Sequence, residues 1–451
     1  MEYCGHVGRI LEVNLNTREI RKKSLDLDLV DRFVGGWGIN FKLAYDLMKP
    51  GTPPLSPENP IIIGVGPLVG TLSPGSSKVS VTTKFALPAT EDDRHYVTTA
   101  SSGSRQFGLM LKNTGYDHVV ITGRAKTPVY LKIIDDDVEI CDAGHLWGKK
   151  DIYETSDELS GKYGVCGVIA IGRAGENLIR FAMAATDKVN TLGRSGFGAV
   201  MGSKNLKAIV VQGTKGVRVS DQARLMKTVD TMYQNFQTNM KPHNDPVGLG
   251  AWPILVMPNF DPGVWSKDDW DALYGERKWH ELNIQARACS SCWIACRPAA
   301  KVKDGEFTGV NMETGNFLWV QVVGQRLGLA DFRQAMKLYD LANRAGVSHV
   351  ASFKVKEPLM VEFTKIPLEE AKAMKRPTVR ATVLEEYKKY VIAVGPNEAG
   401  RFTVASDQEG QMIRTRIKRS AAALGLDVRL KKVRNEILFW HENGASGFSV
   451  S

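Results

Sequence analysis

Three closely spaced cysteines are the clearest candidates for chemistry in this sequence: Cys289, Cys292 and Cys296, in the run Cys-Ser-Ser-Cys-Trp-Ile-Ala-Cys. The C-x-x-C-x-x-x-C spacing lets three thiolates converge on one soft metal centre, and thiolates are ligands of iron–sulfur clusters and of zinc. The alternative is that the three cysteines pack as small buried hydrophobes. The polar neighbours Ser290 and Arg297 argue against such packing, so we predict a metal site.

The composition is that of an ordinary globular protein of two or three domains. The 451 residues are 43% apolar and 24% charged, values typical of chains with substantial cores. Six cysteines are too few for a disulfide framework, and their clustering favours a metal in a reducing compartment. No signal-peptide pattern opens the sequence, and glycine and proline interrupt its longest apolar stretch, residues 61–69. We therefore expect a cytoplasmic protein without a membrane partner.

The net charge of +10 is concentrated at the end of the chain. Residues 353–451 contain 18 Lys and Arg but only 12 Asp and Glu, a surplus of 6. A surplus of this size is usual for a solvated face. A nucleic-acid partner is therefore not expected from composition.

Hydrophobic periodicity divides the chain into three parts. Residues 1–212 predict a β-rich domain with a mixed sheet, because short alternating runs are separated by glycine-rich turns. Residues 213–352 predict a mostly helical domain that carries the cysteine run, and residues 353–451 predict a small basic α+β tail. No internal repeat is evident. Strands and helices do not alternate strictly, so the expected fold class is α+β rather than a doubly wound sheet.

Three segments rich in small residues have the form of ligand-binding loops: residues 71–78, 98–104 and 192–207. The first ends in Lys78 before a strand. The second is predicted to open a helix, whose unpaired backbone N–H groups can bind an anion. The third has glycines that let a backbone approach a ligand, with Arg194, Lys204 and Lys207 as cations. It lacks the strand-to-helix fingerprint of a Rossmann nucleotide site.

Together these segments resemble the tungsten-dependent aldehyde ferredoxin oxidoreductases. The likeness begins at Gly8-Arg-Ile-Leu-Glu-Val-Asn-Leu, runs to about Ala351 and covers roughly three quarters of the chain. The specific matches follow the family's order: Leu55-Ser-Pro-Glu-Asn, Gly115-Tyr-Asp, Ala174-Gly-Glu-Asn, Arg194-Ser-Gly-Phe-Gly-Ala-Val-Met-Gly-Ser-Lys-Asn-Leu-Lys-Ala-Ile and the cysteine run.

The resemblance implies a β-rich base for a tungsten bis-pterin cofactor, covered by two helical domains. It also implies a [4Fe–4S] cluster that passes electrons to ferredoxin, and a reaction that oxidises an aldehyde with water to a carboxylic acid. Tungsten and molybdenum both fit, because the pterin supplies the metal's sulfur ligands, and Mg²⁺ is an optional further ion. Thiolates suit the iron, and glycine-rich loops with cations suit an anionic pterin.

The resemblance also assigns roles to individual residues. Cys289, Cys292 and Cys296 match three cluster ligands. Lys78 matches a family arginine between cluster and pterin; it keeps the charge but loses the planar fork. Glu313 matches a glutamate near the metal that can handle protons at an aldehyde. The other matches lie in two pterin loops: Ser101, Gly103, Asn190, Thr191, Gly193 and Arg194.

The sequence departs from the family pattern at two places. In Asn343-Arg-Ala-Gly346-Val-Ser348, two acidic pterin contacts are replaced by Asn343 and Ser348, which accept hydrogen bonds more weakly. From about Ser352 the resemblance ends, and the family's C-terminal domain, with a fourth cluster cysteine and an active-site histidine, is not recognisable. Four alternatives follow. The chain is an oxidoreductase whose cluster and pocket are completed by a second chain or an unusual ligand, or it is a truncated or fused relative that binds the cluster or pterin without turnover. Alternatively, the tail is a basic binding module on an oxidoreductase scaffold, or the chain is a subunit of a split or benzoyl-CoA-reductase-like complex.

Overall fold

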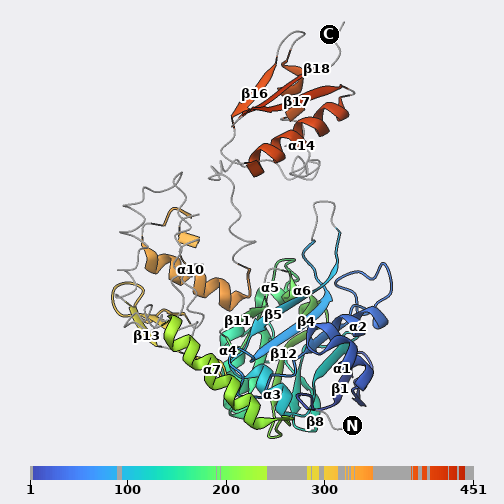
Figure 1. The fold of residues 1–451 in the computed structure, drawn as a ribbon, viewed down its shortest axis with the longest axis vertical. Helices are drawn as coiled ribbons and strands as arrows, with labels where there is room; N and C mark the ends of the chain where they lie inside the picture. The colour runs from blue at the N-terminus through green and yellow to red at the C-terminus, as the bar shows by residue number, and fades with distance from the viewer. Residues whose placement is uncertain are drawn as a thin grey trace. The chain divides into compact units, whose positions relative to one another are not determined.

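The computed structural model describes most of the first 240 residues and shorter stretches beyond them (Figure 1). The described residues are 4–88, 94–188, 190–192, 195–240, 282–285, 287–293, 299–312, 320, 323–324, 327–329, 331–348, 387–388, 390–394, 399–403, 407–424, 426–433 and 436–441. The chain forms two compact units, Met1–Pro358 and Leu359–Ser451. The predicted domain boundaries near 212 and 352 stay a prediction.

Residues 9–122, here called the first half, form a six-stranded mixed sheet with three helices. Its elements are β1 (Arg9–Asn14), β2 (Glu19–Ser24), α1 (Leu27–Phe33), α2 (Trp37–Leu47), β3 (Ile61–Gly64), β4 (Lys78–Lys84), β5 (Val97–Gly103), α3 (Phe107–Asn113) and β6 (His118–Thr122). The strand order is β2-β1-β6-β3-β4-β5, and β1 and β6 are its parallel pair. Strands β1 and β2 form an antiparallel hairpin.

Residues 129–212, the second half, form another six-stranded sheet. Its elements are β7 (Val129–Ile134), β8 (Asp137–Asp142), α4 (Ile152–Tyr163), β9 (Gly167–Ile171), α5 (Arg173–Glu176), β10 (Ala184–Thr186), β11 (Asn190–Leu192), α6 (Phe197–Ser203) and β12 (Leu206–Gln212). The strand order is β11-β10-β9-β12-β7-β8, and β7 and β12 are its parallel pair.

The two halves repeat one topology. Strands β7 to β12 take the same places in the second sheet as β1 to β6 take in the first, including the parallel pair. The structure thus contains a repeat that is not evident in the residue identities. The repeat lies in the order of strands, while the strands themselves differ: β4 and β5 have 7 residues each, whereas β10 and β11 have 3 each.

One hydrophobic core joins both sheets and includes side chains of α3 and α6. Alternation along β3 shows how a strand serves two layers, because successive side chains point to opposite faces. Ile61 and Ile63 belong to the shared core, whereas Ile62 packs on the other face in the cluster that includes α1 and α2. Helix α4 covers the corresponding outer face of the second sheet.

The rest of the first unit adds helices and a small sheet. Its described elements are α7 (Gln222–Met240), β13 (Leu282–Gln285), β14 (Ala299–Val302), β15 (Asn311–Met312) and α10 (Phe332–Ala345). The three strands pair antiparallel in the order β13-β14-β15. Asp331 caps α10 by accepting a hydrogen bond from the Arg333 N–H, and Gly346 ends the helix in the left-handed conformation, with φ 76°. The predicted helix at 317–327 lies largely outside the described residues.

The second unit is a small α+β module, as predicted. Its regular elements are β16 (Gly400–Thr403), α14 (Asp407–Ala423), β17 (Val428–Val433) and β18 (Glu436–His441). The strands pair antiparallel in the order β16-β18-β17, and α14 packs against one face of this sheet. The α+β fold class is confirmed. Within the described part of the chain, every helix is too short or too polar to cross a bilayer.

Candidate functional site

The second predicted ligand loop is a strand rather than a helix opening. Residues 97–103 form β5, which pairs along its whole length with β4. Lys78 lies opposite Gly103, and Ser80 lies opposite Ser101, with 2.9 Å between the two hydroxyl oxygens. The prediction that this segment opens a helix is wrong, because its threonine and serine side chains pair well across a sheet.

Helix α3 begins later, and a carboxylate from the second half holds its first turn. Asp187 accepts hydrogen bonds from the N–H groups of Gln106 and Phe107, at 3.0 and 2.9 Å. Its other oxygen accepts from the Val168 N–H at 2.9 Å. Burial raises the pKa of Asp187, while these backbone donors act in the opposite direction. The backbone N–H groups that were expected to bind an anion therefore donate to Asp187 instead.

The end of β5 lies beside β11. A Cβ added at Gly103 would lie 3.5 Å from the side-chain oxygen of Asn190, so the glycine leaves ordinary contact space there. Asn190 is buried, and within the described residues its Nδ2 has no hydrogen-bond partner. A buried N–H without a partner costs free energy, so a polar ligand atom beside it would be stabilised. Thr191 follows in β11, whereas Gly193 and Arg194 lie outside the described residues.

The cysteine run is anchored close to this place. Both the N–H and the hydroxyl of Ser290 donate hydrogen bonds to the Arg105 carbonyl oxygen, the N–H at 3.3 Å. The Cys292 N–H donates to the Cys289 carbonyl oxygen at 3.1 Å, so the first two cysteines share one tight turn. Both cysteine side chains are half-buried. The cysteine loop therefore lies against a residue only two positions after Gly103.

A tryptophan holds the other side of the cysteine loop. The Trp293 ring meets Tyr233 edge-on, with ring centroids 5.3 Å apart, and Phe236 at 6.4 Å, both from α7. Such aromatic pairs stabilise a contact beyond the area they bury. Cys296 and Glu313 lie outside the described residues, and within those residues no three His, Cys, Asp or Glu side chains form a metal-binding group. The predicted cluster ligands and the predicted proton carrier stay predictions.

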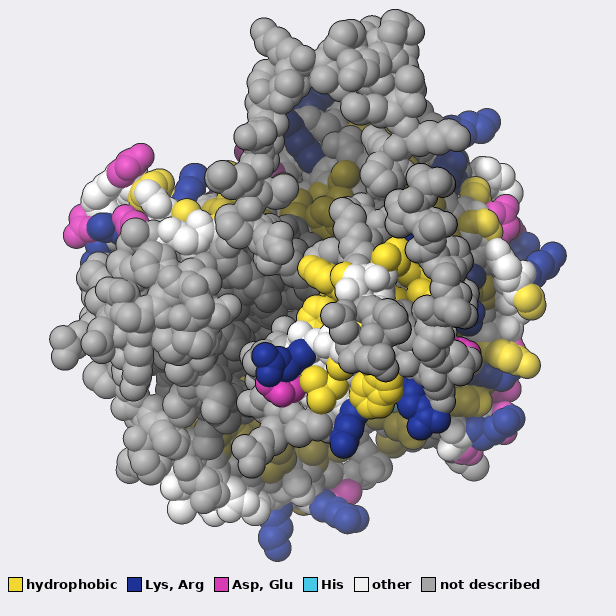
Figure 2. Space-filling model, turned by 90° about the horizontal axis from the view of Figure 1, so that it is seen from above, with side chains coloured by type: hydrophobic (Ala, Val, Ile, Leu, Met, Phe, Trp, Pro, Cys, Tyr) yellow, Lys and Arg dark blue, Asp and Glu magenta, His cyan; other side chains and the backbone are white. Residues whose placement is uncertain are grey.

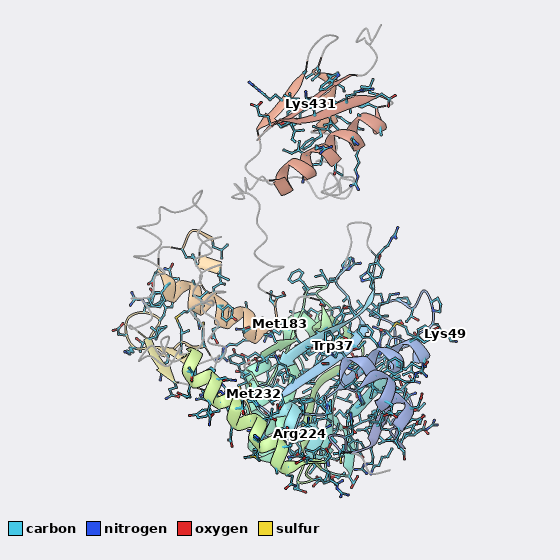
Figure 3. The ribbon with its side chains drawn as sticks, in the orientation of Figure 1. Trp37, Lys49, Met183, Arg224, Met232 and Lys431 are labelled. Carbon is cyan, nitrogen blue, oxygen red and sulfur yellow. The ribbon has the colours of Figure 1, made fainter. Side chains whose placement is uncertain are left out.

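Lys78 is exposed at the start of β4 and lines a cavity of about 560 Å³. The cavity lies between the α1–α2 turn and residues 66–76. Val34 and Gly36 both have positive φ, 62° and 51°, and this sharp turn separates helices α1 and α2. Three apolar side chains at the cavity are exposed: Val34 by 64%, Trp37 by 62% and Leu68 by 52%. Figure 3 labels Trp37, and Figure 2 shows hydrophobic side chains at the surface beside Lys and Arg.

The residues that replace two family acids lie at the C-terminal end of α10. Asn343 and Ser348 are both buried. The Met183 N–H donates to the Gly346 carbonyl oxygen at 2.8 Å, and the Ser348 N–H donates to the Phe181 carbonyl oxygen at 3.3 Å (Met183 is labelled in Figure 3). This segment therefore packs on the second half rather than on the small sheet.

An ionic contact reinforces the same docking. Arg344 pairs with Asp340 on its own helix at 2.9 Å and with Asp151, the N-cap of α4, at 3.2 Å. Its guanidinium also lies over the Tyr153 ring, 4.6 Å from the centroid. Burial raises the pKa of Asp340, and the arginine opposes that rise. The end of α10 is thus held to α4 by charge as well as by backbone hydrogen bonds.

Lys204 and Lys207, which the sequence suggested as ligand-binding cations, contact groups of the protein itself. Lys204 and Lys207 are fully buried. The Lys204 ammonium donates to the carbonyl oxygens of Pro57 and Gly123, at 3.0 and 3.1 Å. Lys207 pairs with Glu176 and donates to two further carbonyl oxygens. The interpretation of both as ligand-binding cations is wrong, because sequence spacing does not show whether a lysine side chain is buried among carbonyl groups.

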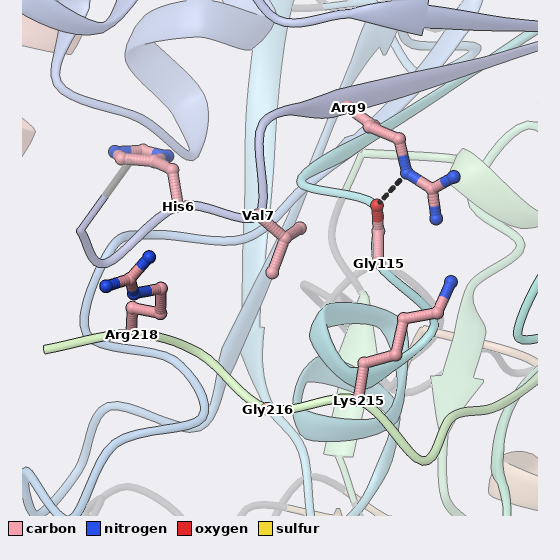
Figure 4. Close-up of a pocket in the computed structure, with 7 residues that line it drawn as sticks. All are labelled: His6, Val7, Arg9, Gly115, Lys215, Gly216 and Arg218. Carbon is pink, nitrogen blue, oxygen red and sulfur yellow. Dashed lines mark hydrogen bonds between the residues drawn. The ribbon is translucent and has the colours of Figure 1, made fainter. Parts of the chain in front are cut away.

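Another cavity, of about 430 Å³, is basic but already has internal partners (Figure 4). Arg9 donates through Nε to the Gly115 carbonyl oxygen at 2.9 Å. Asp136 then pairs with Arg9 at 2.8 Å and with Lys215 at 2.6 Å. Because one carboxylate serves two of the lining cations, we assign no ligand to this cavity.

The structure thus gathers Lys78, Gly103 and Asn190 around the end of β5, with Cys289 and Cys292 beside the following loop. Sequence reasoning missed Asp187 and Arg105. Asp187 gave a weak signal, as a lone acid three residues before the second pterin loop. Arg105 acts at this contact through its backbone carbonyl, for which side-chain identity gives no signal.

Comparison with known proteins matches this chain to a family. The model of the aldehyde ferredoxin oxidoreductase N-terminal domain matches residues 10–213, and the model of domains 2 and 3 matches residues 231–352. The tungsten-containing aldehyde ferredoxin oxidoreductases of Pyrococcus furiosus and Thermococcus kodakarensis are each 34% identical over 366 residues, which is 77% of this chain and 57% of each relative. The chain therefore spans little more than half the length of these relatives.

More distant relatives have other names. The WOR-like subunit of the aliphatic sulfonate oxidoreductase of Pyrococcus furiosus is 27% identical over 381 residues, covering 76% of this chain and 57% of that protein. Among solved structures, the active-site complex BamBC of benzoyl coenzyme A reductase with 1,5-dienoyl-CoA matches with a TM-score of 0.65. That match is 25% identical in sequence and covers 77% of this chain and 54% of the solved chain.

Proposed function

Because this chain belongs to the aldehyde ferredoxin oxidoreductase family, we propose that it forms the cofactor-binding part of a tungsten-dependent oxidoreductase. In this proposal an aldehyde is oxidised to a carboxylic acid, and the electrons pass through a [4Fe–4S] cluster to ferredoxin. The observation that carries the proposal is the pair of hydrogen bonds from Ser290 to the Arg105 carbonyl oxygen. They hold the first two cysteines beside the end of β5, so the proposed cluster ligands lie close to the proposed pterin contacts.

The described residues fit a pterin at the end of β5. Gly103 leaves contact space in front of Asn190, and the buried Asn190 Nδ2 offers a hydrogen bond that no described residue takes. Lys78, opposite Gly103, supplies an exposed positive charge for a phosphate group. When bound, the tungsten bis-pterin supplies a metal centre that accepts two electrons from the substrate. The residues that we propose as its contacts are Lys78, Ser101, Gly103, Asn190, Thr191, Gly193, Arg194, Asn343 and Ser348.

Asn343 and Ser348 lie in a separate segment from the other proposed pterin contacts. Their burial at the docked end of α10 fixes them relative to the second half, which suits residues that orient a cofactor. Both side chains are neutral, so they favour a neutral hydrogen-bonding edge of the pterin over a cationic one. Cys289, Cys292 and Cys296 are the proposed iron ligands, and Glu313 is the proposed proton carrier.

A second candidate follows from the solved relative. The BamBC match is an active-site complex in which a CoA thioester is bound, and this chain spans 54% of the matched chain. We therefore propose, as the alternative, that a second chain completes the pocket and that the substrate is a CoA thioester rather than a free aldehyde. The exposed apolar side chains at the Lys78 cavity are compatible with such a partner.

One assay distinguishes the two candidates. The chain, purified anaerobically from cells grown with tungstate, is analysed for tungsten and then tested for viologen reduction with simple aldehydes and, separately, with aromatic CoA thioesters. We expect tungsten to be bound and aldehydes to be oxidised. We also expect Glu313→Gln to lower the rate by about 10²-fold or more, the usual range for loss of an acid–base group. The matched control is Glu306→Gln, an exposed carboxylate seven positions earlier, which should leave the rate unchanged.

Two results would count against the first candidate. Tungsten with turnover of CoA thioesters alone would favour the second candidate. Equal rates for Glu313→Gln and Glu306→Gln would remove Glu313 from the proposed chemistry.

A further inference from the structure

The turn between β10 and β11 has an uncommon backbone conformation just before Asn190. Thr186 and Asn190 are the closing pair of this hairpin, so residues 187–189 form its turn. Asp187 and Lys188 both have positive φ, 52° and 63°, which side chains other than glycine rarely adopt. Such a conformation persists only where the surrounding contacts hold it.

Asp187 makes those contacts in two directions. Its N–H donates to the Val168 carbonyl oxygen at 2.8 Å, and the Val168 N–H donates to Asp187 Oδ1 at 2.9 Å. Its Oδ2 accepts from the N–H groups of Gln106 and Phe107, at 3.0 and 2.9 Å. Hydrogen bonds to a carboxylate are among the stronger ones. One residue therefore fastens the hairpin turn both to β9 and to the start of α3.

Each of the two segments that Asp187 joins carries a contact of the candidate site. On the hairpin side, Asn190 follows three positions later, with its side-chain oxygen 3.5 Å from the place of a Cβ at Gly103. On the helix side, the Arg105 carbonyl oxygen accepts from the N–H and the hydroxyl of Ser290 in the cysteine loop. Asp187 thus links the proposed pterin contact to the proposed cluster loop.

We propose that Asp187 is a positioning residue that fixes the separation between the cysteine loop and Asn190. This role rests on the proposed function, because it concerns electrons that pass from a pterin-bound metal to a cluster. A misplacement of about 1 Å between reacting groups can lower a rate by about 10²-fold. Asp187 acts through the Arg105 carbonyl and through Asn190, and the structure gives it no part in the chemistry itself.

Asp135, in the turn between β7 and β8, offers a matched control. It too has a positive φ, 48°, and its N–H donates to the Gln212 carbonyl oxygen at 2.9 Å. Its carboxylate accepts from the N–H and the hydroxyl of Thr214, both at 2.9 Å. Asp135→Asn and Asp187→Asn therefore make the same change in the same kind of turn, but the Asp135 turn is fastened to Thr214 rather than to α3.

Hydrogen–deuterium exchange of the full chain tests the link without relying on turnover. An amide accepts at one oxygen only, so Asp187→Asn cannot keep its hydrogen bonds to both β9 and α3. We expect exchange at the Phe107 and Ser290 N–H groups to quicken by about tenfold or more, as for the loss of a hydrogen bond to a charged group. Asp135→Asn should leave both amides within about twofold of the wild type. Asp187→Glu, which keeps the charge but lengthens the side chain, should also quicken both and serves where Asp187→Asn does not fold.

Reduction of the cluster tests the effect on the proposed chemistry. The holoenzyme, purified anaerobically, is reduced either by an aldehyde or directly by dithionite, and the absorbance of the cluster is followed. We expect Asp187→Asn to slow reduction by the aldehyde by about tenfold or more, with reduction by dithionite within about twofold of the wild type. Asp135→Asn should change neither rate.

Three results would overturn the proposal. One is unchanged exchange at the Ser290 N–H in both Asp187 variants. Another is equal quickening of that exchange in Asp135→Asn. The third is equal slowing of both reductions in Asp187→Asn, which would make Asp187 a residue of general stability only. A wild-type chain that binds neither iron nor tungsten would instead overturn the proposed function, and the exchange experiment would still decide whether Asp187 joins the two segments.

Discussion

The two halves of the first unit share one strand order but stabilise it with different buried charges. Each half contains a buried lysine paired with a carboxylate, here called its anchor: Lys112 lies in the last turn of α3, and Lys207 lies in β12. In the first half, Lys112 pairs with Asp117 at 2.5 Å. In the second half, Lys207 pairs with Glu176. The two anchors therefore occupy different places in the repeated topology, the first joining α3 to the start of β6 and the second joining β12 to α5.

The titratable side chains that surround the two anchors differ. Asp117 also accepts hydrogen bonds from the Val7 and Gly8 N–H groups and lies 3.5 Å from His6, so the first anchor ties the N-terminal segment to the sheet. The second anchor instead holds carbonyl oxygens, and its neighbour Lys204 does the same. The first half therefore buries a histidine beside its anchor and the second half buries a second lysine, which predicts that stability rises with pH in two different pH ranges.

Replacing the lysine of either anchor should have the largest effect on the free energy of unfolding. Lys112→Met leaves Asp117 buried without its cation, and Lys207→Met likewise leaves Glu176 buried without its cation. Each should lower the free energy of unfolding by about 3–5 kcal/mol, the usual cost of removing one partner from a buried pair. Urea unfolding measures the change. Lys132→Met, which removes a cation from exposed carboxylates, should cost less than about 1 kcal/mol. A comparable loss in all three variants would contradict the distinction.

Acid should destabilise the first half through His118. Burial lowers its pKa to about 3, below an ordinary value near 6.5, so the folded chain keeps it neutral while the unfolded chain takes up a proton. Stability is therefore lost as pH falls through that window, by about 2 kcal/mol between about pH 7 and 5. The nearby Asp117, whose pKa is lowered, contributes only at still lower pH. His118→Gln should remove most of this dependence; an unchanged slope would rule out the histidine as its source.

Alkali should stabilise the second half through Lys204. Burial lowers its pKa to about 7, whereas the unfolded lysine keeps a value near 10.5. Between these values the unfolded chain binds more protons, so stability rises with pH, by about 1.5 kcal/mol from about pH 7 to 8.5. Lys204→Met should flatten this rise in thermal unfolding measured at several pH values. A rise that persists in the variant would point to another group.

Removing one helix cap from each half should give the smallest difference in the free energy of unfolding. Asp151 caps α4 in a full capping box with Glu154 and also pairs with Arg344. Asp26 caps α1 through one hydrogen bond, to the Asp28 N–H. Replacement by Ala should cost about 1 kcal/mol or more at Asp151 and about 0.5 kcal/mol at Asp26. Chemical unfolding of the two variants side by side tests the order, which would be contradicted if Asp26→Ala cost more.

Local signals in the sequence predicted most of the regular elements but not how they meet. Alternation predicted the β-rich first part, and helical spacing predicted helices such as those found at α7 and α10 in the second, because each signal lies within one element. Strand β5 was missed, since its hydroxyl side chains do not alternate with apolar ones. The repeat of the two halves was missed because it lies in strand order rather than in residue identity.

In the candidate site too, local features were predicted and contacts between distant segments were not. The cysteine spacing is local and was found, whereas its anchor joins Ser290 to a backbone carbonyl 185 positions earlier. Lys204 and Lys207 were assigned to a ligand because their sequence context is rich in glycine. Their burial among carbonyl groups follows from packing of α6 and β12, which the sequence alone does not describe.

Iron content is the most direct test of the central claim, that the loop beside Arg105 carries a cluster. The chain is purified anaerobically, its iron and acid-labile sulfide are measured, and the reduced protein is examined by electron paramagnetic resonance. We predict about four irons per chain and the signal of a reduced [4Fe–4S] cluster. Both should be lost in Cys292→Ser and kept in Cys166→Ser, which changes a buried cysteine in the second half. Iron that is absent from the wild type, or equally present in both variants, would contradict the account.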